Sequence, residues 1–461
     1  HIHERKSLLM IPAARADSTR GTLHRARSYQ TVALLLSAAS SIAPGLHSTQ
    51  LALLLPQTLA SRSAPPCVLL LTCGTQAAAR DASHAASDAA HGGVWGLARV
   101  VRLEHAGLRA QSIDVSRCTS ARTMKALAAD DLAEAETVLS GDSRYAARLR
   151  ACCSGSMAVG GPLRLCGRYT VMGGLGGLGL RAAGLLSSRG VVEVQLASRS
   201  GRVARDGHAQ LQLVGATARV VACDGADARD THSVFGRAVD GVLHAAGVGD
   251  KGLMTEVTSA RVHWMLTPKA LGAWYIHCLP ATTPLQASIL FSSVGSGLGN
   301  VGQSNYAAAN AYLDGQALSR RAHGMVGCSL QWPLVGGAGM GAATFNSTQL
   351  DAMGALSLDE FAAQLSPLLA PAGLRAEAAG DVGDGALLPA QPCSSSVVVF
   401  SDSSDAGRHR ETLAVSGGMF PVSPHSLLYK SWNNAVFSRN CSSVRGAISS
   451  SSRLMSETIG W

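Results

Sequence analysis

Aromatic and charged residues are scarce in this sequence. Aromatic side chains account for 4% of the 461 residues and charged side chains for 15%, against 47% hydrophobic residues and 50 glycines. A chain of this length has room for two or three domains with full hydrophobic cores. The balance suits an α/β protein whose elements are rich in alanine, glycine and leucine.

Several other features are missing. No apolar run reaches the length of a membrane span. The net charge is +9, from 39 basic and 30 acidic residues, but no Lys/Arg cluster is interleaved with aromatics. We therefore expect no nucleic acid, and an anionic cofactor is sufficient reason for the spread of arginines. The 11 cysteines contain no C-x-x-C pair, which favours free thiols in a reducing compartment and gives no metal motif.

The amino-terminal residues bear on location. The chain begins at His1 rather than at Met, from which we expect a piece of a longer protein. Its first 28 residues are rich in arginine and nearly free of acids, as in organelle transit peptides, but a ragged interdomain end explains this equally well. We predict a cytoplasmic protein, with an organelle stroma as the alternative.

A strand, a loop of small residues and a helix organise the middle of the chain. The apolar run 287–291 predicts a buried strand, and Ser293 stands where that strand ends. After a loop rich in Gly, Ser and Asn, Tyr306 opens a helix of good helix formers. Asn310 follows four residues later, on the same face of the helix as Tyr306. The pattern predicts that the phenol and the amide point at one spot near the serine.

A glycine-rich turn follows an earlier strand candidate. Residues 169–172 are expected to form a strand, residues 173–179 a turn and residues 180–189 a helix. Glycines in such a turn let the backbone approach a pyrophosphate, and the helix N-terminus offers free N–H groups. The next strand, 191–196, is followed by Arg199 with a hydroxyl on each side, which favours the 2′-phosphate of NADPH. The alternative is a solvated loop arginine.

The stretch from Ser292 to Asp314 resembles the active site of the short-chain dehydrogenase/reductase superfamily. It is most similar to the ketoreductase domains of modular polyketide synthases and animal-type fatty acid synthases, in which the loop reads SS…GxxGQxxYxAANxxLD. Those domains carry Asn four residues after the Tyr, as here at Asn310, and place the lysine upstream, as here at Lys269. The resemblance covers roughly residues 90–370.

The resemblance implies NADPH-dependent reduction of a β-ketoacyl group on the phosphopantetheine arm of an acyl carrier protein, within a synthase of several domains. The residues that it implies in catalysis are Lys269, Ser293, Tyr306 and Asn310. The residues that it and the turn imply in cofactor binding are Gly173, Gly174, Leu175, Gly176, Gly177, Leu178, Gly179, Ser198, Arg199, Ser200, Asp224, His244, Ala245, Ala246, Gly247, Lys269 and Tyr306.

Each polar group receives an expected role. Tyr306 would donate the proton, and the ammonium of Lys269 would lower the pKa of the phenol. Ser293 would hydrogen-bond the carbonyl oxygen as charge develops on it. Asn310 would order a water that links Lys269 to the outside. His244 could be mistaken for a general base, but we expect a structural histidine.

The expected fold is α/β with two Rossmann-like subdomains. Residues 1–158 would form a truncated structural subdomain, because the run VWGLARVVRLEHAGLRAQSIDVS and the exit strand near 141–149 resemble that part of synthase ketoreductases. Residues 159–370 would form the catalytic, doubly wound parallel sheet, ending in a helical segment at 350–369. Residues 371–461 are rich in Ser, Gly and Pro and predict a low-complexity or disordered linker or tail.

The chain departs from the family pattern in places. Met172 stands where Thr usually precedes the first glycine, and the segment 224–241 is several residues shorter than expected. The Leu-Asp-Asp of one stereochemical class is replaced by Gly249, Asp250 and Lys251. The Trp of the opposite class is replaced by Leu298, so the handedness of the product stays open.

Two alternatives to a synthase ketoreductase remain. The first is a free-standing short-chain reductase of small ketones, which the non-catalytic N-terminal half disfavours. The second is a catalytically silent scaffold, which the broken stereochemical signals favour. The intact serine, tyrosine, lysine and asparagine argue against the scaffold, because decay would affect those residues first.

Overall fold

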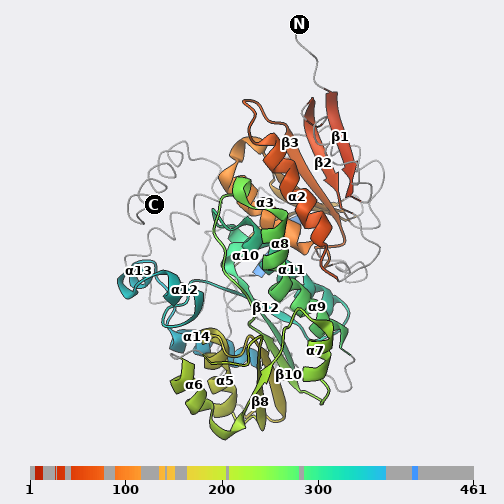
Figure 1. The fold of residues 1–461 in the computed structure, drawn as a ribbon. Coiled ribbons are helices and arrows are strands. Elements are labelled where there is room, and N and C mark those ends of the chain that lie inside the picture. Colours follow the sequence, from red (N-terminus) through yellow and green to blue (C-terminus); the bar gives the residue numbers. More distant parts are fainter. Residues whose placement is uncertain are drawn as a thin grey trace.

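The computed structural model describes most of the chain up to residue 369 and one later strand. These parts form two β-sheets with helices packed around them (Figure 1). The described residues are 6–13, 26, 28–36, 43–76, 89–115, 134–140, 143–150, 164–203, 207–279, 285–369 and 397–402.

The first sheet has seven strands in the order β1-β2-β3-β4-β5-β6-β13. The first five pair in parallel, whereas β6 and β13 run antiparallel to their neighbours. Strand β3 is apolar along most of its length and β2 along its second half, as expected of parallel strands that are covered on both faces. The bounds are β1 Lys6–Pro12, β2 Tyr29–Leu35, α2 Leu46–Leu59, β3 Cys67–Cys73, α3 Gly92–Glu104, η3 Ala106–Leu108, β4 Gln111–Val115, β5 Glu136–Ser140, β6 Ser143–Arg150 and β13 Val397–Asp402.

The second sheet has six parallel strands in the order β12-β11-β10-β7-β8-β9. The winding direction reverses between β7 and β10, so the loops that follow these two strands diverge and leave a crevice at the carboxyl edge. The strand bounds are β7 Arg168–Met172, β8 Glu193–Ser198, β9 Ala218–Ala222, β10 Gly241–His244, β11 Ala287–Ser293 and β12 Cys328–Trp332.

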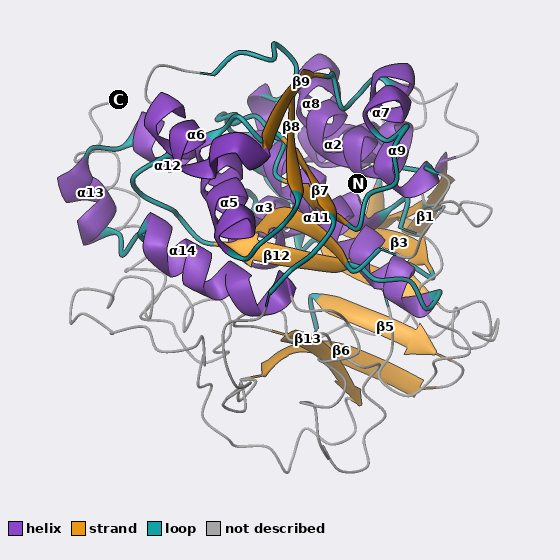
Figure 2. Ribbon diagram, turned by 90° about the horizontal axis from the view of Figure 1, so that it is seen from below, coloured by secondary structure: helices purple, strands orange, loops and turns teal. Residues whose placement is uncertain are grey.

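Helices cover both faces of the second sheet. Figure 2 shows α5, α6 and α14 on one side and α7, α8 and α9 on the other. The bounds are α5 Gly177–Ser188, α6 His208–Val214, η5 Gly215–Thr217, α7 Ala228–Val234, η6 Met254–Glu256, α8 Ser259–Leu266, the π-helix η7 Thr267–Leu271, α9 Gly272–Cys278, α10 Val294–Leu298, α11 Ser304–Ala322, α12 Gly339–Thr344, α13 Ser347–Ala352, α14 Leu358–Leu365 and η8 Ser366–Leu369.

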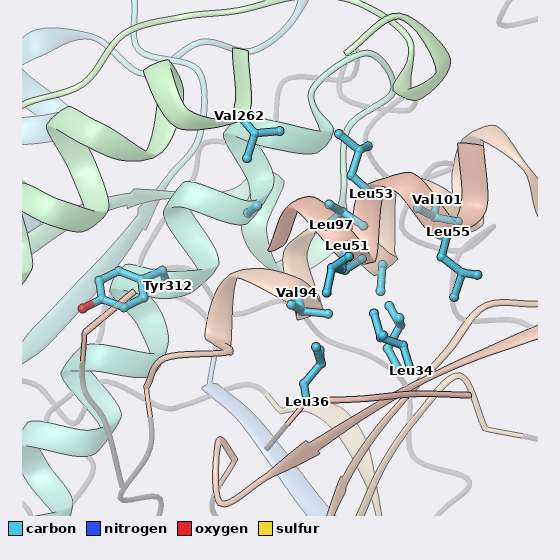
Figure 3. Packing of buried hydrophobic residues seen from close by; sticks show 14 of the residues in the cluster. Leu34, Leu36, Leu51, Leu53, Leu55, Val94, Leu97, Val101, Val262 and Tyr312 are labelled. Atoms are coloured by element: carbon cyan, nitrogen blue, oxygen red, sulfur yellow. The ribbon is translucent and has the colours of Figure 1, made fainter. Parts of the chain in front are cut away.

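The first sheet and its helices share one hydrophobic cluster with helices that flank the second sheet. Side chains of β2, α2 and α3 lie in the same buried cluster as side chains of α8 and α11. Figure 3 shows part of this cluster, with Leu34 and Leu36 below, Leu51 and Val94 in the middle and Val262 of α8 above. The N-terminal half therefore packs directly on the elements that carry Tyr306.

The tightest contact in this core joins α3 to α11. A Cβ atom on Gly93 would lie 2.9 Å from the carbonyl oxygen of Ala308, and one on Gly96 would lie 2.2 Å from the carbonyl oxygen of Ala307. Real Cβ atoms do not approach backbone so closely, since well-packed interiors leave no such overlap. The glycines of α3 thus allow two helix backbones to touch.

The sequence predictions around the catalytic motifs are confirmed. The strand and helix on either side of the glycine turn are β7 and α5, and the strand and helix on either side of the serine loop are β11 and α11. The expected helix over 350–369 is broken instead. Gly354 takes a φ of +67°, and Ser357 caps a new helix by accepting from the N–H of Glu360 at 3.2 Å.

Two strands lie where none was predicted. Residues 6–12, assigned to a leader or a ragged end, form β1 because an apolar run there pairs with β2. Residues 397–402, assigned to a disordered tail, form β13, whose run of valines and phenylalanine favours extended backbone. The rest of the segment 371–461 lies outside the described residues.

Substituting Gly96 tests the helix contact. We expect Gly96→Ala to lower the free energy of unfolding by about 1–3 kcal/mol through overpacking, despite the better helix propensity of alanine. The matched control is Gly184→Ala in α5, where a Cβ meets nothing within 4 Å and alanine should add about 0.5–1 kcal/mol. Urea unfolding of the two variants measures both changes. Equal effects of the two substitutions would contradict the contact.

Candidate active site

Ser293, Tyr306 and Asn310 come together at the end of β11. Ser293 is the last residue of that strand and caps α10, since its Oγ accepts from the N–H of Gly295 at 3.2 Å. Tyr306 lies in the first turn of α11, and Asn310 follows one turn later, where its Nδ2 donates to the carbonyl of Tyr306 at 2.9 Å. The side chains of Asn310 and Ser293 both approach the phenol closely enough to affect its pKa.

Lys269 lies beneath the phenol. It belongs to the π-helix η7, is only 4% exposed, and donates from Nζ to the carbonyl of Phe291 at 2.9 Å. Its Nζ is 5.6 Å from the centroid of the Tyr306 ring. The lysine that lies 24 residues before Ser293 in the sequence (293 − 269) is thus brought beside the tyrosine.

The protonation equilibria of the two groups differ from the sequence-based prediction. Burial raises the pKa of Tyr306 above its ordinary value, and the side chains of Asn310 and Ser293 only oppose this rise. The predicted net lowering of the phenol pKa by Lys269 is therefore wrong for this structure. Burial lowers the pKa of Lys269 itself to about 8, and the carboxylate of Asp314 acts in the opposite direction.

Asn310 offers an acceptor that nothing in the described chain uses. Its Oδ1 is buried without a hydrogen-bond partner there. Buried polar atoms are nearly always satisfied by protein or by ordered water. The amide is therefore suited to hold a water beside Tyr306, in keeping with the role expected from the sequence.

The glycine turn forms a tight cradle of backbone. A Cβ on Gly173 would lie 2.6 Å from the N atom of Ala246, and one on Gly174 would lie 2.9 Å from Cα of Leu196. The N–H groups of Gly173 and Gly174 both donate to the carbonyl of Ala197, at 2.8 and 3.0 Å. These backbone bonds brace the turn, while the preceding Met172 packs into an apolar cluster.

The N-terminus of α5 suits a phosphate group. Gly176 is its exposed N-cap, and no side chain caps the helix, so the first N–H groups are available to an anion. A Cβ on Gly177 would lie 2.4 Å from that of Ala338 and 2.6 Å from the N atom of Gly339. The segment that begins α12 therefore lies against this first turn. Glycine is required where backbone must come this close, and the residues present fit a dinucleotide.

The other residues expected to bind a cofactor line the same crevice or support it. Arg199 and Asp224 share one pocket, and the Oγ of Ser198 is buried with no partner within the described ranges, whereas Ser200 accepts from the N–H of Arg202 at 3.2 Å. His244 is fully buried and its Nε2 lies 2.9 Å from the carbonyl of Lys269.

The histidine is neutral, as a structural role requires. Burial lowers the pKa of His244 to about 4. The turn that follows it consists of small residues because Lys269 lies against it. A Cβ on Gly247 would lie 2.7 Å from Cε of Lys269. His244 therefore holds the backbone of Lys269, and Gly247 leaves room for its side chain.

The residues at the stereochemical positions have structural partners. Asp250 forms an ion pair with Arg261, at 2.6 Å between Oδ1 and Nη2, and accepts from Nδ2 of Asn305 at 2.6 Å. Asn305 in turn accepts from the N–H of Tyr306 at 2.8 Å. Lys251 places its Nζ 5.1 Å from the centroid of the Phe345 ring, which joins the loop after β10 to the segment between α12 and α13.

Three supporting residues were not found by sequence reasoning. Arg99 donates to the carbonyl of Ser296 at 2.6 Å, and Glu104 accepts from the N–H groups of Met254 and Gly302 at 2.6 and 2.7 Å. Asp314 accepts from Ser296, Ser329 and Gln331. Only Asp314 carried a signal, as the last letter of the motif, whereas the partners of Arg99 and Glu104 lie about 150 to 200 residues away in the sequence.

Two other kinds of site are absent from the described ranges. No helix there is both long and apolar enough to cross a membrane. Within the same ranges, no group of three or more His, Cys, Asp or Glu side chains is arranged to hold a metal ion.

The part of the chain that holds this site is similar to known proteins. Residues 167–337 match the family described as "KR domain". A solved structure described as an A-type ketoreductase from a modular polyketide synthase is 30% identical, with a TM-score of 0.66 and coverage of 78% of either chain. The polyketide synthase GfsA of Streptomyces halstedii is 36% identical over 274 residues, which are 57% of this chain and 4% of that protein.

A third relative bears on activity. The putative inactive polyketide synthase Pks1 of Mycobacterium tuberculosis, named for phenolphthiocerol synthesis, is 38% identical over 179 residues. That match covers 36% of this chain and 11% of the relative. The chain thus spans only a small fraction of the curated relatives that it resembles.

Replacing Lys269 tests its burial. The folded pKa near 8, against 10.5 when exposed, means that the unfolded chain binds more protons between these values, so the parent gains stability as pH rises through that window. At pH 7 we expect Lys269→Met to be more stable by about 2 kcal/mol, since about 3 kcal/mol of burial cost is relieved and about 1 kcal/mol of hydrogen bonding is lost.

Denaturant unfolding at pH 7, 8.5 and 10 measures this difference, which should shrink as the pH rises. Leu213→Met is the control, because it places methionine at an exposed position and removes no titratable group, so its stability difference should not change with pH. A constant advantage of Lys269→Met at all three pH values would contradict the buried, titrating ammonium.

Proposed function

Because this chain belongs to the KR-domain family of polyketide synthase ketoreductases, we propose that it reduces a β-ketoacyl thioester to the β-hydroxyacyl form with NADPH. The observation that carries the proposal is the arrangement around one phenol. The side chains of Ser293 and Asn310 both lie close enough to the phenol of Tyr306 to affect its pKa, and the Nζ of Lys269 lies 5.6 Å from the centroid of its ring. All four lie at the carboxyl edge of the second sheet, beside the glycine turn.

The chemistry follows from these groups. Bound NADPH supplies the hydride that reaches the carbonyl carbon. The Oγ–H of Ser293 donates to the carbonyl oxygen, where negative charge develops. The phenol of Tyr306 gives up its proton to the same oxygen. The ammonium of Lys269 stabilises the phenolate electrostatically, and a water held by Oδ1 of Asn310 returns the proton.

The choice of cofactor rests on Arg199. It is exposed at the end of β8 and shares a pocket with Asp224. An acidic residue at the strand end would accept from the ribose hydroxyls of NADH, whereas a guanidinium binds a 2′-phosphate with paired hydrogen bonds. This favours NADPH.

The substrate and the surroundings are further parts of the proposal. The family resemblance favours an acyl group on the phosphopantetheine arm of an acyl carrier protein in a multidomain synthase, in the cytoplasm. A silent scaffold is the second candidate, because α12 lies against the pyrophosphate turn and a relative is named inactive.

Turnover of NADPH with a short β-ketoacyl thioester tests the proposal. Tyr306→Phe removes the proton donor, so kcat should fall by about 10²–10⁴-fold, far more than the KM for NADPH changes, because the phenol is only one of several expected contacts to the cofactor. Tyr275→Phe in α9 is the matched control and should leave both constants unchanged. A folded parent that binds NADPH without turning it over would favour the scaffold.

The cofactor preference has its own test. We expect Arg199→Ala to raise the KM for NADPH by about 10- to 100-fold, the value of a hydrogen bond to a charged group, and to leave the KM for NADH nearly unchanged. Arg202→Ala, at a neighbouring exposed arginine, should alter neither value. A parallel loss with both cofactors would remove the assignment of the 2′-phosphate site.

A further inference from the structure

A small pocket lies on the outer side of the π-helix that carries Lys269. Its volume is about 180 Å³, below the several hundred Å³ of a site for a whole dinucleotide, so it suits a single ring system. The residues that line it are Arg199, Asp224, Val248, His263, Trp264, Thr267 and Pro268.

The π-helix contributes Thr267 and Pro268 to this pocket. An extra residue per turn widens the backbone between α8 and α9, a distortion that is common at functional sites. Lys269 points inward and is 4% exposed, whereas Trp264, five residues earlier, is 47% exposed. Thr267 and Pro268 of the wide turn form the rim next to the indole.

Trp264 is the only large aromatic side chain among the pocket residues. A half-exposed indole leaves apolar surface in water, and a planar partner would cover it. The other charged and polar side chains around it are a guanidinium, a carboxylate, an imidazole and a hydroxyl. Arg199 suits a phosphate, and Asp224 suits a donor such as an exocyclic amine. Together these groups match a phosphorylated purine nucleoside.

We propose that Trp264 is a positioning residue for the cofactor, and that its indole stacks on the adenine ring of the adenosine 2′-phosphate end. This rests on the proposed function, since NADPH contains that group. Stacking of a base on an aromatic side chain does not depend on hydrogen-bond direction and adds to the contacts of Arg199 and Asp224. Neither the motif pattern nor the glycine turn pointed to this tryptophan.

Binding of adenosine 2′,5′-bisphosphate tests the inference apart from catalysis. This probe has the adenine and the 2′-phosphate but no nicotinamide, so it reports on the pocket alone. Calorimetric titration of Trp264→Leu should give a dissociation constant about 10-fold weaker than the parent, and Trp264→Phe should recover part of the loss. The probe should also quench part of the tryptophan fluorescence of the parent, and Trp264→Leu should lack that change.

Trp274→Leu is the matched control. That indole is stacked on His277 with ring centroids 5.9 Å apart and does not line the pocket, so its removal should leave the affinity unchanged. If Trp264→Leu binds the probe as tightly as the parent does, the stacking role is overturned and the reductase proposal stands. If the folded parent binds neither the probe nor NADPH, the proposed function fails and the inference fails with it.

Discussion

Helices α3 and α11 touch backbone to backbone, and the candidate site depends on that contact. Because three glycines of α3 face the alanines of α11, the N-terminal half lies directly against the helix that carries Tyr306 in its first turn. Two side chains of α3 extend this contact. Arg99 donates to the carbonyl of Ser296, and Glu104 accepts from the N–H groups of Met254 and Gly302. The first sheet and its helices therefore support the segments that carry the candidate site.

A single carboxylate organises the polar groups beneath the phenol. Asp314 accepts from Ser329, and the Oγ of Ser296 lies within hydrogen-bond distance of both Asp314 and the carbonyl of Ser293, either of which can accept its single proton. Burial lowers the pKa of Lys269, and the negative charge of Asp314 partly offsets this effect, which keeps the ammonium form accessible near neutral pH. Asp314 therefore affects both the position of Ser293 at the end of β11 and the charge of Lys269 in η7.

Much of this site was predictable from the sequence because the family motif fixes spacing along one strand and one helix. Ser293, Tyr306, Asn310 and Lys269 were all identified, and the structure brings them together. The direction of the shift in the pKa of Tyr306 was not predictable, because it depends on how completely the surrounding chain shields the phenol from water. Trp264 was not singled out either, because its half-exposed position beside Arg199 and Asp224 depends on how distant segments of the chain pack and not on a local pattern.

Strand β13 changes how the two halves can be separated. It follows the catalytic half in sequence, yet it pairs with β6 at the edge of the first sheet. The chain therefore forms strands β1–β6 of the first sheet, then the six strands of the second sheet, and finally adds β13 to the first sheet. A single cut between the halves leaves β13 on one fragment and the other strands of the first sheet on the other. A fragment that contains the complete first sheet must therefore include both β1–β6 and β13.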